Sequence, residues 1–236
     1  MRKITNSHDV LILSGGLGTR LRPMISDLPK SLAPVNDKSF LDLLIANLSN
    51  QGFKRFILLI GYLGERIIEH FSSVDQLDIV FSVEKKILGT AGAVKNAEPL
   101  INSDPFLVLN GDSLCDINYN GLIDFHKSKQ SSLTIAISKS REAQDYGQIE
   151  IGKDNRIVSF SEKKSINKVS YVNAGVYVLN KTVLKYIPLN EKYSNEFDFF
   201  PYVIRNSNCF GYEVKNDFWD IGTPSKYIDF ISAFKR

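Results

Sequence analysis

The chain opens with a short apolar run at residues 10–13 that leads directly into the glycine-rich, basic segment "SGGLGTRLRP" at 14–23. The apolar run predicts a buried strand. Three glycines then free the backbone, and two arginines and a proline follow within the same ten positions. In open α/β sheets, loops at the carboxyl ends of strands are where ligands bind. The segment therefore points to an α/β fold with a site at the end of its first strand.

Strand-like and helix-like patterns alternate over about residues 8–140. Apolar residues at helical spacing predict helices at 40–52, 65–71, 90–100 and 121–130, the first of them ending at Gly52. Apolar runs predict strands at 54–62, 77–84, 105–112 and 132–138. This alternation predicts a Rossmann-like, mostly parallel mixed sheet with helices on both faces.

Strands dominate after about residue 140. The segment 147–163 predicts a hairpin that turns at "KDN", and further strands are expected at 171–180 and 209–214. Helices are expected at 194–206 and 223–236, each opened by a serine or threonine at a capping position. We expect one domain over 1–236, in which a half at about 8–140 and a strand-rich half at about 141–236 share one sheet.

Composition excludes several classes of protein. The net charge of the 236 residues is +3 and the lysines are scattered among acids, so nucleic-acid binding is not expected and any anion site must be local. No apolar stretch is long enough for a membrane span, and no secretory core follows the N-terminal basic residues, so we expect a cytoplasmic protein. Cys115 and Cys209 lie far apart and are expected to be free thiols.

The basic loop does not match the familiar phosphate loops. A Walker A loop needs Lys-Ser directly after its last glycine, but Lys30 follows Pro29. A dinucleotide fingerprint would need a glycine at Leu21. What remains is an open glycine loop whose N–H groups can surround phosphate oxygens, with Arg20 and Arg22 beside them. The alternative is a tight turn with solvated arginines, and the combination of glycines with arginine and lysine favours anion binding.

The segment "LSGGLGTRLRPMISDLPKSLAPV" at 13–35 resembles the signature of sugar-1-phosphate nucleotidylyltransferases. These enzymes join a nucleoside triphosphate to a sugar 1-phosphate and release pyrophosphate. Six further segments resemble family motifs in the same order: "LGTAGA" at 88–93, "NGD" at 110–112, "YGQIE" at 146–150, "SFSEK" at 159–163, "NAG" at 173–175 and "WDIGTP" at 219–224.

The resemblance implies roles for individual side chains. Arg20 and Lys30 would hold the triphosphate, Lys163 would grip the sugar phosphate, and Asp112 and Asp220 would bind Mg²⁺. The residues expected to bind the nucleotide are Ser14, Gly15, Gly16, Gly18, Thr19, Glu84, Gly89 and Thr90. Those expected to meet the sugar are Gly111, Gly147, Glu162 and Asn173. In this scheme the first half binds the nucleotide and the second half binds the sugar.

Glu84 bears on the choice of base, because the family contacts the base with the segment before "LGTAGA". Guanine presents adjacent N1–H and N2–H donors, which suit the two oxygens of a carboxylate, whereas uracil and thymine suit an amide. Glu84 therefore favours GTP, and a solvated glutamate beside Lys85 and Lys86 is the alternative. That Asp112 and Asp220 meet is a prediction about folding, since Asp220 could instead cap the turn before the last helix.

The substrate sugar is inferred from overall likeness alone. The chain is most similar to the compact guanylyltransferases that act on D-glycero-α-D-manno-heptose 1-phosphate and supply GDP-heptose for bacterial capsule and lipopolysaccharide. Mannose-1-phosphate guanylyltransferases and N-acetylmuramate-1-phosphate uridylyltransferases are the alternatives. An inactive sugar-nucleotide-binding protein is disfavoured, because the expected metal and phosphate residues are all present.

Two further groups of residues receive structural interpretations. His8, His70 and His126 show no ligand spacing and are expected on the surface or on helix faces. The aromatic cluster at 196–202 is expected in the core, with a subunit interface of a homo-oligomer as the alternative.

Overall fold

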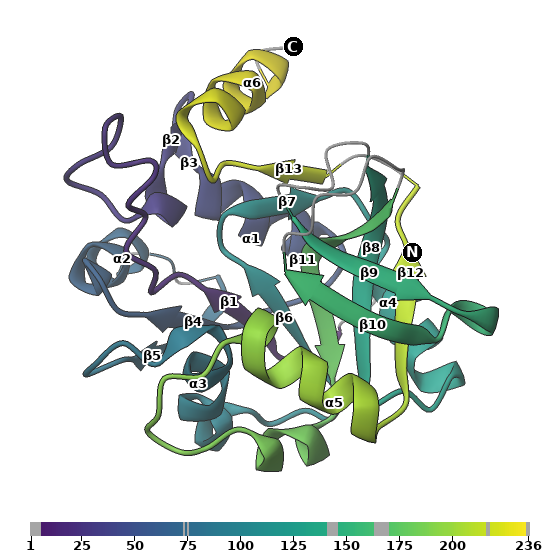
Figure 1. Cartoon of the computed structure of the whole chain (residues 1–236). Coiled ribbons are helices and arrows are strands. Elements are labelled where there is room, and N and C mark those ends of the chain that lie inside the picture. The colour runs from purple at the N-terminus through teal and green to yellow at the C-terminus, as the bar shows by residue number, and fades with distance from the viewer. Residues whose placement is uncertain are drawn as a thin grey trace.

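A nine-stranded mixed sheet forms the centre of the molecule (Figure 1). The structure is a computed structural model that describes residues 6–72, 74, 76–140, 146–162, 170–215 and 218–234. The strands of the sheet are β1 (Val10–Leu13), β4 (Arg55–Ile60), β5 (Asp78–Val83), β6 (Phe106–Asn110), β8 (Leu133–Ser140), β9 (Gly147–Ile151), β10 (Ile157–Glu162), β11 (Ser170–Leu179) and β12 (Cys209–Glu213).

The sheet has a parallel half and a mixed half. Strands β6, β1, β4 and β5 run parallel in that spatial order. The long strand β11 then pairs antiparallel with β6 and β9 along one edge and with β8 along the other, and β12 adds to β8 in parallel. The hairpin β9–β10 forms where the sequence predicts it, with the short helical turn η4 (Lys153–Asn155) between its strands. The predicted α/β fold with a mixed, mostly parallel sheet is confirmed.

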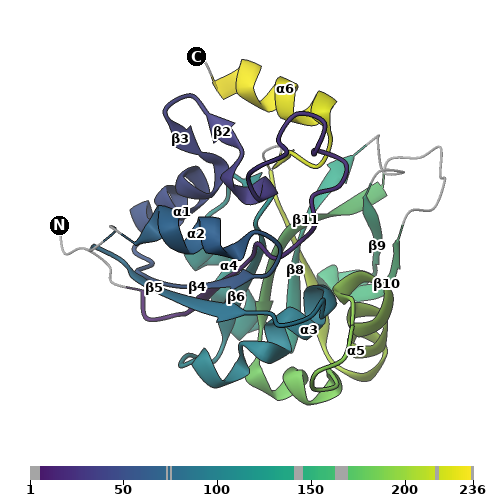
Figure 2. The ribbon, with the colours of Figure 1, turned by 90° about the vertical axis from the view of Figure 1, so that its left-hand side faces the viewer.

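Helices cover both faces of this sheet (Figure 2). One face carries α1 (Phe40–Asn50), α2 (Gly64–Phe71), α4 (Tyr119–Ser128) and α6 (Pro224–Phe234), and the other carries α3 (Gly89–Asn96) and α5 (Phe200–Asn206). Alternate residues of β1 belong to the two layers: Val10 and Ile12 pack with the first group, and Leu11 packs with the second. Burial on both faces explains the continuous apolar runs of the central strands.

Helix ends follow the sequence signals closely. The Ser39 and Asp42 side chains form a capping box at the start of α1, and after the helix the Gly52 N–H donates to the Ser49 carbonyl. The Ser194 hydroxyl accepts from the backbone of Glu196 and Phe197, as expected of a capping residue. The segment after it, Asn195–Phe199, is a π-helical turn that leads into α5. No helix within the described ranges has the length and apolar character needed to cross a membrane.

A small second sheet brings the end of the chain to its middle. Strand β7 (Ser113–Cys115) pairs antiparallel with β13 (Phe218–Asp220), which places Asp220 opposite Ser113. One residue further on, the Ile221 N–H donates to the Asp112 carbonyl over 3.0 Å. Strands β2 (Pro34–Val35) and β3 (Lys38–Ser39) form a two-strand hairpin next to α6. The Tyr227 hydroxyl of α6 donates a hydrogen bond to the Pro34 carbonyl of this hairpin. Long-range pairing therefore sets where Asp220 lies.

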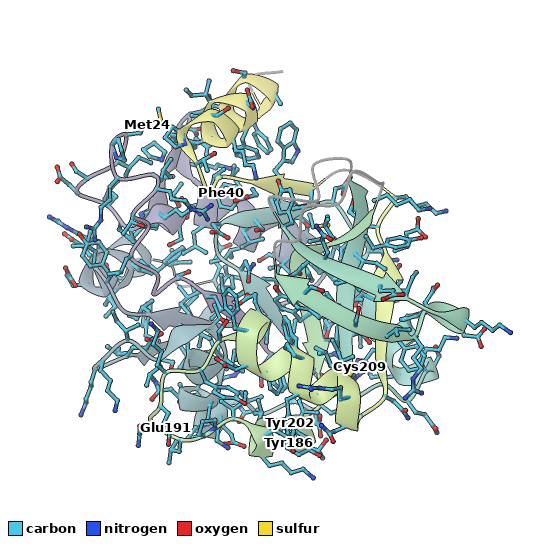
Figure 3. All side chains as sticks on the ribbon, in the orientation of Figure 1. Met24, Phe40, Tyr186, Glu191, Tyr202 and Cys209 are labelled. Atoms are coloured by element: carbon cyan, nitrogen blue, oxygen red, sulfur yellow. The ribbon has the colours of Figure 1, made fainter. Side chains whose placement is uncertain are left out.

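The aromatic cluster divides between core and surface. Phe199 and Phe200 are buried as expected, whereas Phe197 is 70% exposed and Tyr202 is 42% exposed. Tyr202 stands beside Tyr186 at the outer edge of α5 (Figure 3), with 5.2 Å between the ring centroids. The assignment of the whole cluster to the core was therefore only half right, because this segment presents one side of a helical turn to solvent.

His126 lies on helix α4 as expected, but its ring is buried against the sheet. Cys115 and Cys209 are buried free thiols, and burial raises the pKa of each to about 12. None of these three side chains reaches the pocket described below.

Candidate active site

A pocket of about 500 Å³ opens at the carboxyl ends of β1 and β6. This is the edge of an open parallel sheet at which ligands are expected. Twelve of the predicted site residues line it: Ser14, Gly15, Gly16, Gly18, Thr19, Arg20, Lys30, Glu84, Gly89, Thr90, Gly111 and Asp112. Folding thus gathers segments from the first half of the chain around one space.

The glycine-rich loop is attached to the neighbouring strand β4. The Ser14 N–H donates to the Leu59 carbonyl over 2.8 Å, and the Tyr62 N–H donates to the Gly15 carbonyl over 3.3 Å. A Cβ atom at Gly15 would lie 3.0 Å from the Gly61 nitrogen and 3.1 Å from Oε1 of Glu84. Only glycine allows this close approach, so the sequence signal at position 15 reflects packing against β4 as well as access for a ligand.

The two arginines of the loop lie apart. Arg20 is exposed and lines the pocket, and it makes no ion pair with any other described residue. Arg22 is not among the described residues that line the pocket, because its guanidinium lies over the ring of Tyr62, 4.7 Å from the centroid. The expectation that both arginines stand beside bound phosphates therefore holds in position only for Arg20.

Lys30 forms an ion pair with Asp112 across the pocket. Its Nζ lies 2.5 Å from Oδ2, and the lysine side chain is only 13% exposed. Lys30 begins the short 3₁₀ turn η1 (Lys30–Leu32) directly after Pro29, whose ring restricts the backbone there. Burial alone would raise the pKa of Asp112, but the charge and hydrogen bond of Lys30 hold it below its usual value. The Asp112 carboxylate is therefore ionised.

The pairing of β13 with β7 places Asp220 opposite Ser113, the residue after Asp112. The Asp220 carboxylate interacts with residues of its own segment. Oδ1 accepts from the Gly222 N–H over 2.6 Å, and Oδ2 lies 3.2 Å from Nζ of Lys226. The structure brings the two segments together as predicted, and it also shows Asp220 capping the turn before α6. Within the described part of the chain, no three His, Cys, Asp or Glu side chains cluster as a metal site. A cation held by these two carboxylates would need further oxygens from a ligand.

Glu84 is half-buried and lines the pocket, so it is not the solvated residue of the alternative interpretation. Its Oε2 accepts from the Leu88 N–H over 3.0 Å at the start of α3. Burial raises the pKa of Glu84, and this hydrogen bond partly opposes the rise. The side chain thus faces the cavity while it holds the turn at 85–88 in place.

Of the residues expected to meet the sugar, Gly111 lines the pocket, whereas Gly147 and Asn173 lie on strands of the second half. Gly147 is buried at the start of β9. The Asn173 amide of β11 donates to the Tyr177 hydroxyl over 2.8 Å, and its carbonyl oxygen accepts from the Gly175 N–H. Neither residue is among the described ones that line the pocket. Glu162 ends β10, but its side chain and all of Lys163 lie outside the described residues.

Glu196 also lines the pocket, although the sequence did not point to it. Its Oε2 accepts from the hydroxyls of Thr90 (3.0 Å) and Ser194 (2.7 Å), which joins α3 to the turn before α5. The capping serine placed Glu196 in the first turn of a helix, where acidic residues are favourable. No signal in the sequence indicated that this turn packs against α3.

A mixed α/β sheet with a glycine loop, Arg20, and the Lys30–Asp112 pair around one pocket defines a nucleotide-binding α/β enzyme. The chain belongs to the nucleotidyl transferase family, whose model matches residues 9–236.

Two relatives are named D-glycero-α-D-manno-heptose 1-phosphate guanylyltransferase. The one from Aneurinibacillus thermoaerophilus is 34% identical over 93% of this chain and 95% of its own length. The one from Campylobacter jejuni is 35% identical over 94% of this chain and 97% of its own length. A mannose-1-phosphate guanyltransferase from Yarrowia lipolytica is 35% identical, and the match covers 94% of this chain but 62% of the relative.

Among solved structures, HddC from Yersinia pseudotuberculosis superposes with a TM-score of 0.85 at 33% identity, covering 96% of this chain and 99% of HddC. A second structure of HddC, complexed with GMP-PN, gives a TM-score of 0.84.

Proposed function

We propose that this protein transfers GMP from GTP to D-glycero-α-D-manno-heptose 1-phosphate, yielding GDP-heptose and pyrophosphate. The observation that carries the chemistry is the pocket, where the glycine loop, Arg20, the Lys30–Asp112 pair and Glu84 face one space. The two heptose-phosphate relatives match over nearly their whole length, and the HddC complex with GMP-PN supports a guanine nucleotide. Mannose 1-phosphate is the second candidate, because a mannose-phosphate relative is equally identical over this chain.

The reaction requires alignment and neutralisation of charge more than proton transfer. The sugar phosphate oxygen is already anionic at neutral pH, so it attacks the α-phosphorus without a general base. The new bond joins that oxygen to the α-phosphorus, and the bond from the α-phosphorus to the bridging oxygen breaks as pyrophosphate leaves in line. We assign to Arg20, Lys30 and the loop N–H groups the task of holding the triphosphate.

A divalent metal ion belongs to this chemistry, and the family generally uses one. Asp112 and Asp220 suit Mg²⁺, because an ionised aspartate and a second carboxylate from a neighbouring segment supply hard oxygen ligands. Within the described residues no third carboxylate, histidine or cysteine joins them as a cluster, so substrate phosphates would supply further oxygens. When bound, Mg²⁺ would neutralise charge on the phosphates. Lys30 and Lys226 each pair with one of these carboxylates in the ligand-free protein.

Selection of the base is assigned to Glu84, with Gly89 and Thr90 beside it in the pocket wall. One carboxylate oxygen already accepts from the Leu88 N–H, and each carboxylate oxygen has a further lone pair for the N1–H and N2–H donors of guanine. The sugar is assigned to Gly111, Gly147, Glu162 and Asn173, with Lys163 on its phosphate. In this scheme residues 8–140 bind the nucleotide and 141–236 bind the sugar.

The test is pyrophosphate release with Mg²⁺, measured for GTP, UTP, dTTP and CTP against heptose, mannose, glucose and N-acetylmuramate 1-phosphates. We expect turnover with GTP and the heptose phosphate to exceed every other pair. A preference for mannose 1-phosphate would overturn the sugar assignment, and a preference for UTP would overturn the base assignment. Nucleotide binding without turnover for any pair would favour the inactive binding protein.

A further inference from the structure

The two arginines of the glycine loop lie in different places. Arg20 lines the pocket, whereas Arg22 does not and lies over Tyr62. At 4.7 Å from the ring centroid, the Arg22 guanidinium is within the range of a cation–π interaction. Arg22 is exposed and forms no ion pair with another described residue, so the stack on Tyr62 is what holds its guanidinium among these residues.

Tyr62 belongs to the turn that supports both parts of the nucleotide pocket. Its N–H donates to the Gly15 carbonyl, which fixes the start of the glycine loop. Two residues earlier, the Ile60 carbonyl accepts from the Glu84 N–H over 2.9 Å, which fixes the residue assigned to the base. The turn at 60–62 therefore sets the position of the phosphate loop relative to Glu84.

The described backbone hydrogen bonds of the far part of the loop are local. Leu21 is buried, and its N–H donates to the Gly18 carbonyl. Between this part of the loop and Tyr62 lies a small cavity of about 10 Å³, lined by Leu17, Leu21, Ile25 and Leu28 among others. Because these backbone hydrogen bonds join the loop to itself, side-chain contacts such as the burial of Leu21 and the stack of Arg22 on Tyr62 set its position against the neighbouring turn.

We propose that Arg22 is a positioning residue whose stack on Tyr62 holds the loop 14–22 in the position that turns Arg20 into the pocket. The inference rests on the proposed function, in which Arg20 binds the triphosphate of GTP. Arg22 itself does not touch the nucleotide. Loss of the stack allows the loop to move, which lowers affinity for GTP and leaves the sugar phosphate unaffected.

The kinetic test uses the variants Arg22→Gln, Tyr62→Leu and the double variant. An exposed cation–π contact predicts a rise of about two- to five-fold in KM for GTP in each single variant, with kcat and the KM of the sugar phosphate unchanged. The double variant should show the same rise as either single variant, because both changes remove one interaction. Tyr62→Phe keeps the aromatic ring and should behave as wild type.

Arg66→Gln is the matched control, since Arg66 is an exposed arginine on the adjoining helix and its ion pair among the described residues is with Glu69 at 3.5 Å. It removes the same charge and should leave KM for GTP unchanged. Increases in KM that multiply in the double variant would overturn the proposal and place Arg22 on the nucleotide. An equal rise in KM for GTP in Tyr62→Phe would also overturn the proposal, because this variant keeps the aromatic ring on which Arg22 stacks.

Hydrogen exchange of the ligand-free protein separates this inference from the proposed function. The amides of Leu21, Met24 and Ile25 form the hydrogen bonds of the loop segment, and their exchange should quicken by about two- to five-fold in Arg22→Gln and in Tyr62→Leu. Unchanged exchange in both variants would reject the stack as a restraint. If wild type turned over no nucleotide but exchange still quickened, the restraint would stand and the proposed function would fall.

Discussion

At the scale of single residues, Glu84 combines a structural hydrogen bond with a position in the pocket wall. Glu84→Gln can keep the bond from the Leu88 N–H through its carbonyl oxygen, which leaves an amide NH₂ group facing the cavity. That group would oppose the N1–H and N2–H donors of guanine. We expect kcat/KM for GTP to fall by about ten-fold or more relative to UTP, measured by pyrophosphate release.

Glu65→Gln provides the control for this change, because Glu65 is an exposed glutamate in the first turn of α2. It should leave the ratio of GTP to UTP use unchanged. Equal losses of activity with every nucleotide in Glu84→Gln would show that the carboxylate only holds the turn at 85–88 and does not select the base.

The sequence predicted the chemistry of the site residues better than it predicted which residues they contact. The glycine loop and Lys30 could be assigned to a pocket because their chemistry suits phosphates, and Glu84 because the resembled family contacts the base with this segment. Glu196 could not, since its place depends on the contact between Thr90 and the turn before α5. The separation of Arg22 from Arg20 was equally hidden, because it depends on a ring supplied by the end of another strand.

At the scale of secondary-structure elements, the packing of α4 against β8 and β11 depends on a buried histidine. Asn180 Oδ1 can only accept a hydrogen bond, so the His126 Nε2–H donates to it over 3.1 Å while Nδ1 accepts from the Thr134 hydroxyl. Burial lowers the pKa of His126, although the bond to Asn180 acts in the opposite direction. The folded protein therefore favours the neutral ring.

This preference predicts a dependence of stability on pH. As pH falls through the ordinary histidine pKa of about 6.5, the unfolded chain gains a proton that the folded protein resists, so His126 makes stability fall in that range. His126→Gln should cost about 1–3 kcal/mol at pH 7.5, measured by urea unfolding, because it disturbs buried hydrogen bonds. The difference in free energy of unfolding between the variant and the wild type should be smaller at pH 5.5. A gap that stayed constant would show that this ring does not titrate differently in the two states.

Most helices and strands were predictable because periodic burial leaves a pattern in the sequence. The pairing of β7 with β13 was not, although its chemistry-bearing residue Asp220 was recognised by resemblance. Strands of three residues carry too few side chains for a pattern, and their partners are distant in sequence. Similarly, the aromatic segment before α5 could not be divided into buried and exposed sides without knowing its π-helical turn.

At the scale of the whole molecule, the pocket joins segments that are far apart in the chain, from the glycine loop to Gly222. A ligand that binds only the folded pocket stabilises it by about 2.7 kcal/mol at one hundred times its Kd. For a chain of this size that corresponds to a rise in Tm of about 5–10 °C. We expect GTP with Mg²⁺ to give this rise in differential scanning fluorimetry.

Arg20→Gln should remove most of that rise in Tm, because Arg20 is the side chain proposed to hold the triphosphate. The exposed arginine makes no ion pair with another described residue, so the Tm without nucleotide should stay unchanged. UTP at the same concentration is the nucleotide control and should give a smaller shift. Equal shifts with GTP and UTP would contradict discrimination of the base in the binding step.

Resemblance to a family suggested Asp112 and Asp220 as metal ligands. The sequence by itself determined the α/β class, the pocket at the end of the first strand and the glycine-rich, basic character of its loop. Those features follow from local causes: burial periodicity, glycine conformations and the charge that polyanions require. Only the tertiary structure decided which side chains meet. Strand pairing brings the segment of Asp220 beside that of Asp112, Lys30 pairs with Asp112 across the pocket, and the Arg22 guanidinium lies over Tyr62 outside the pocket lining. Such contacts depend on strand order and register, which no local pattern of residues encodes.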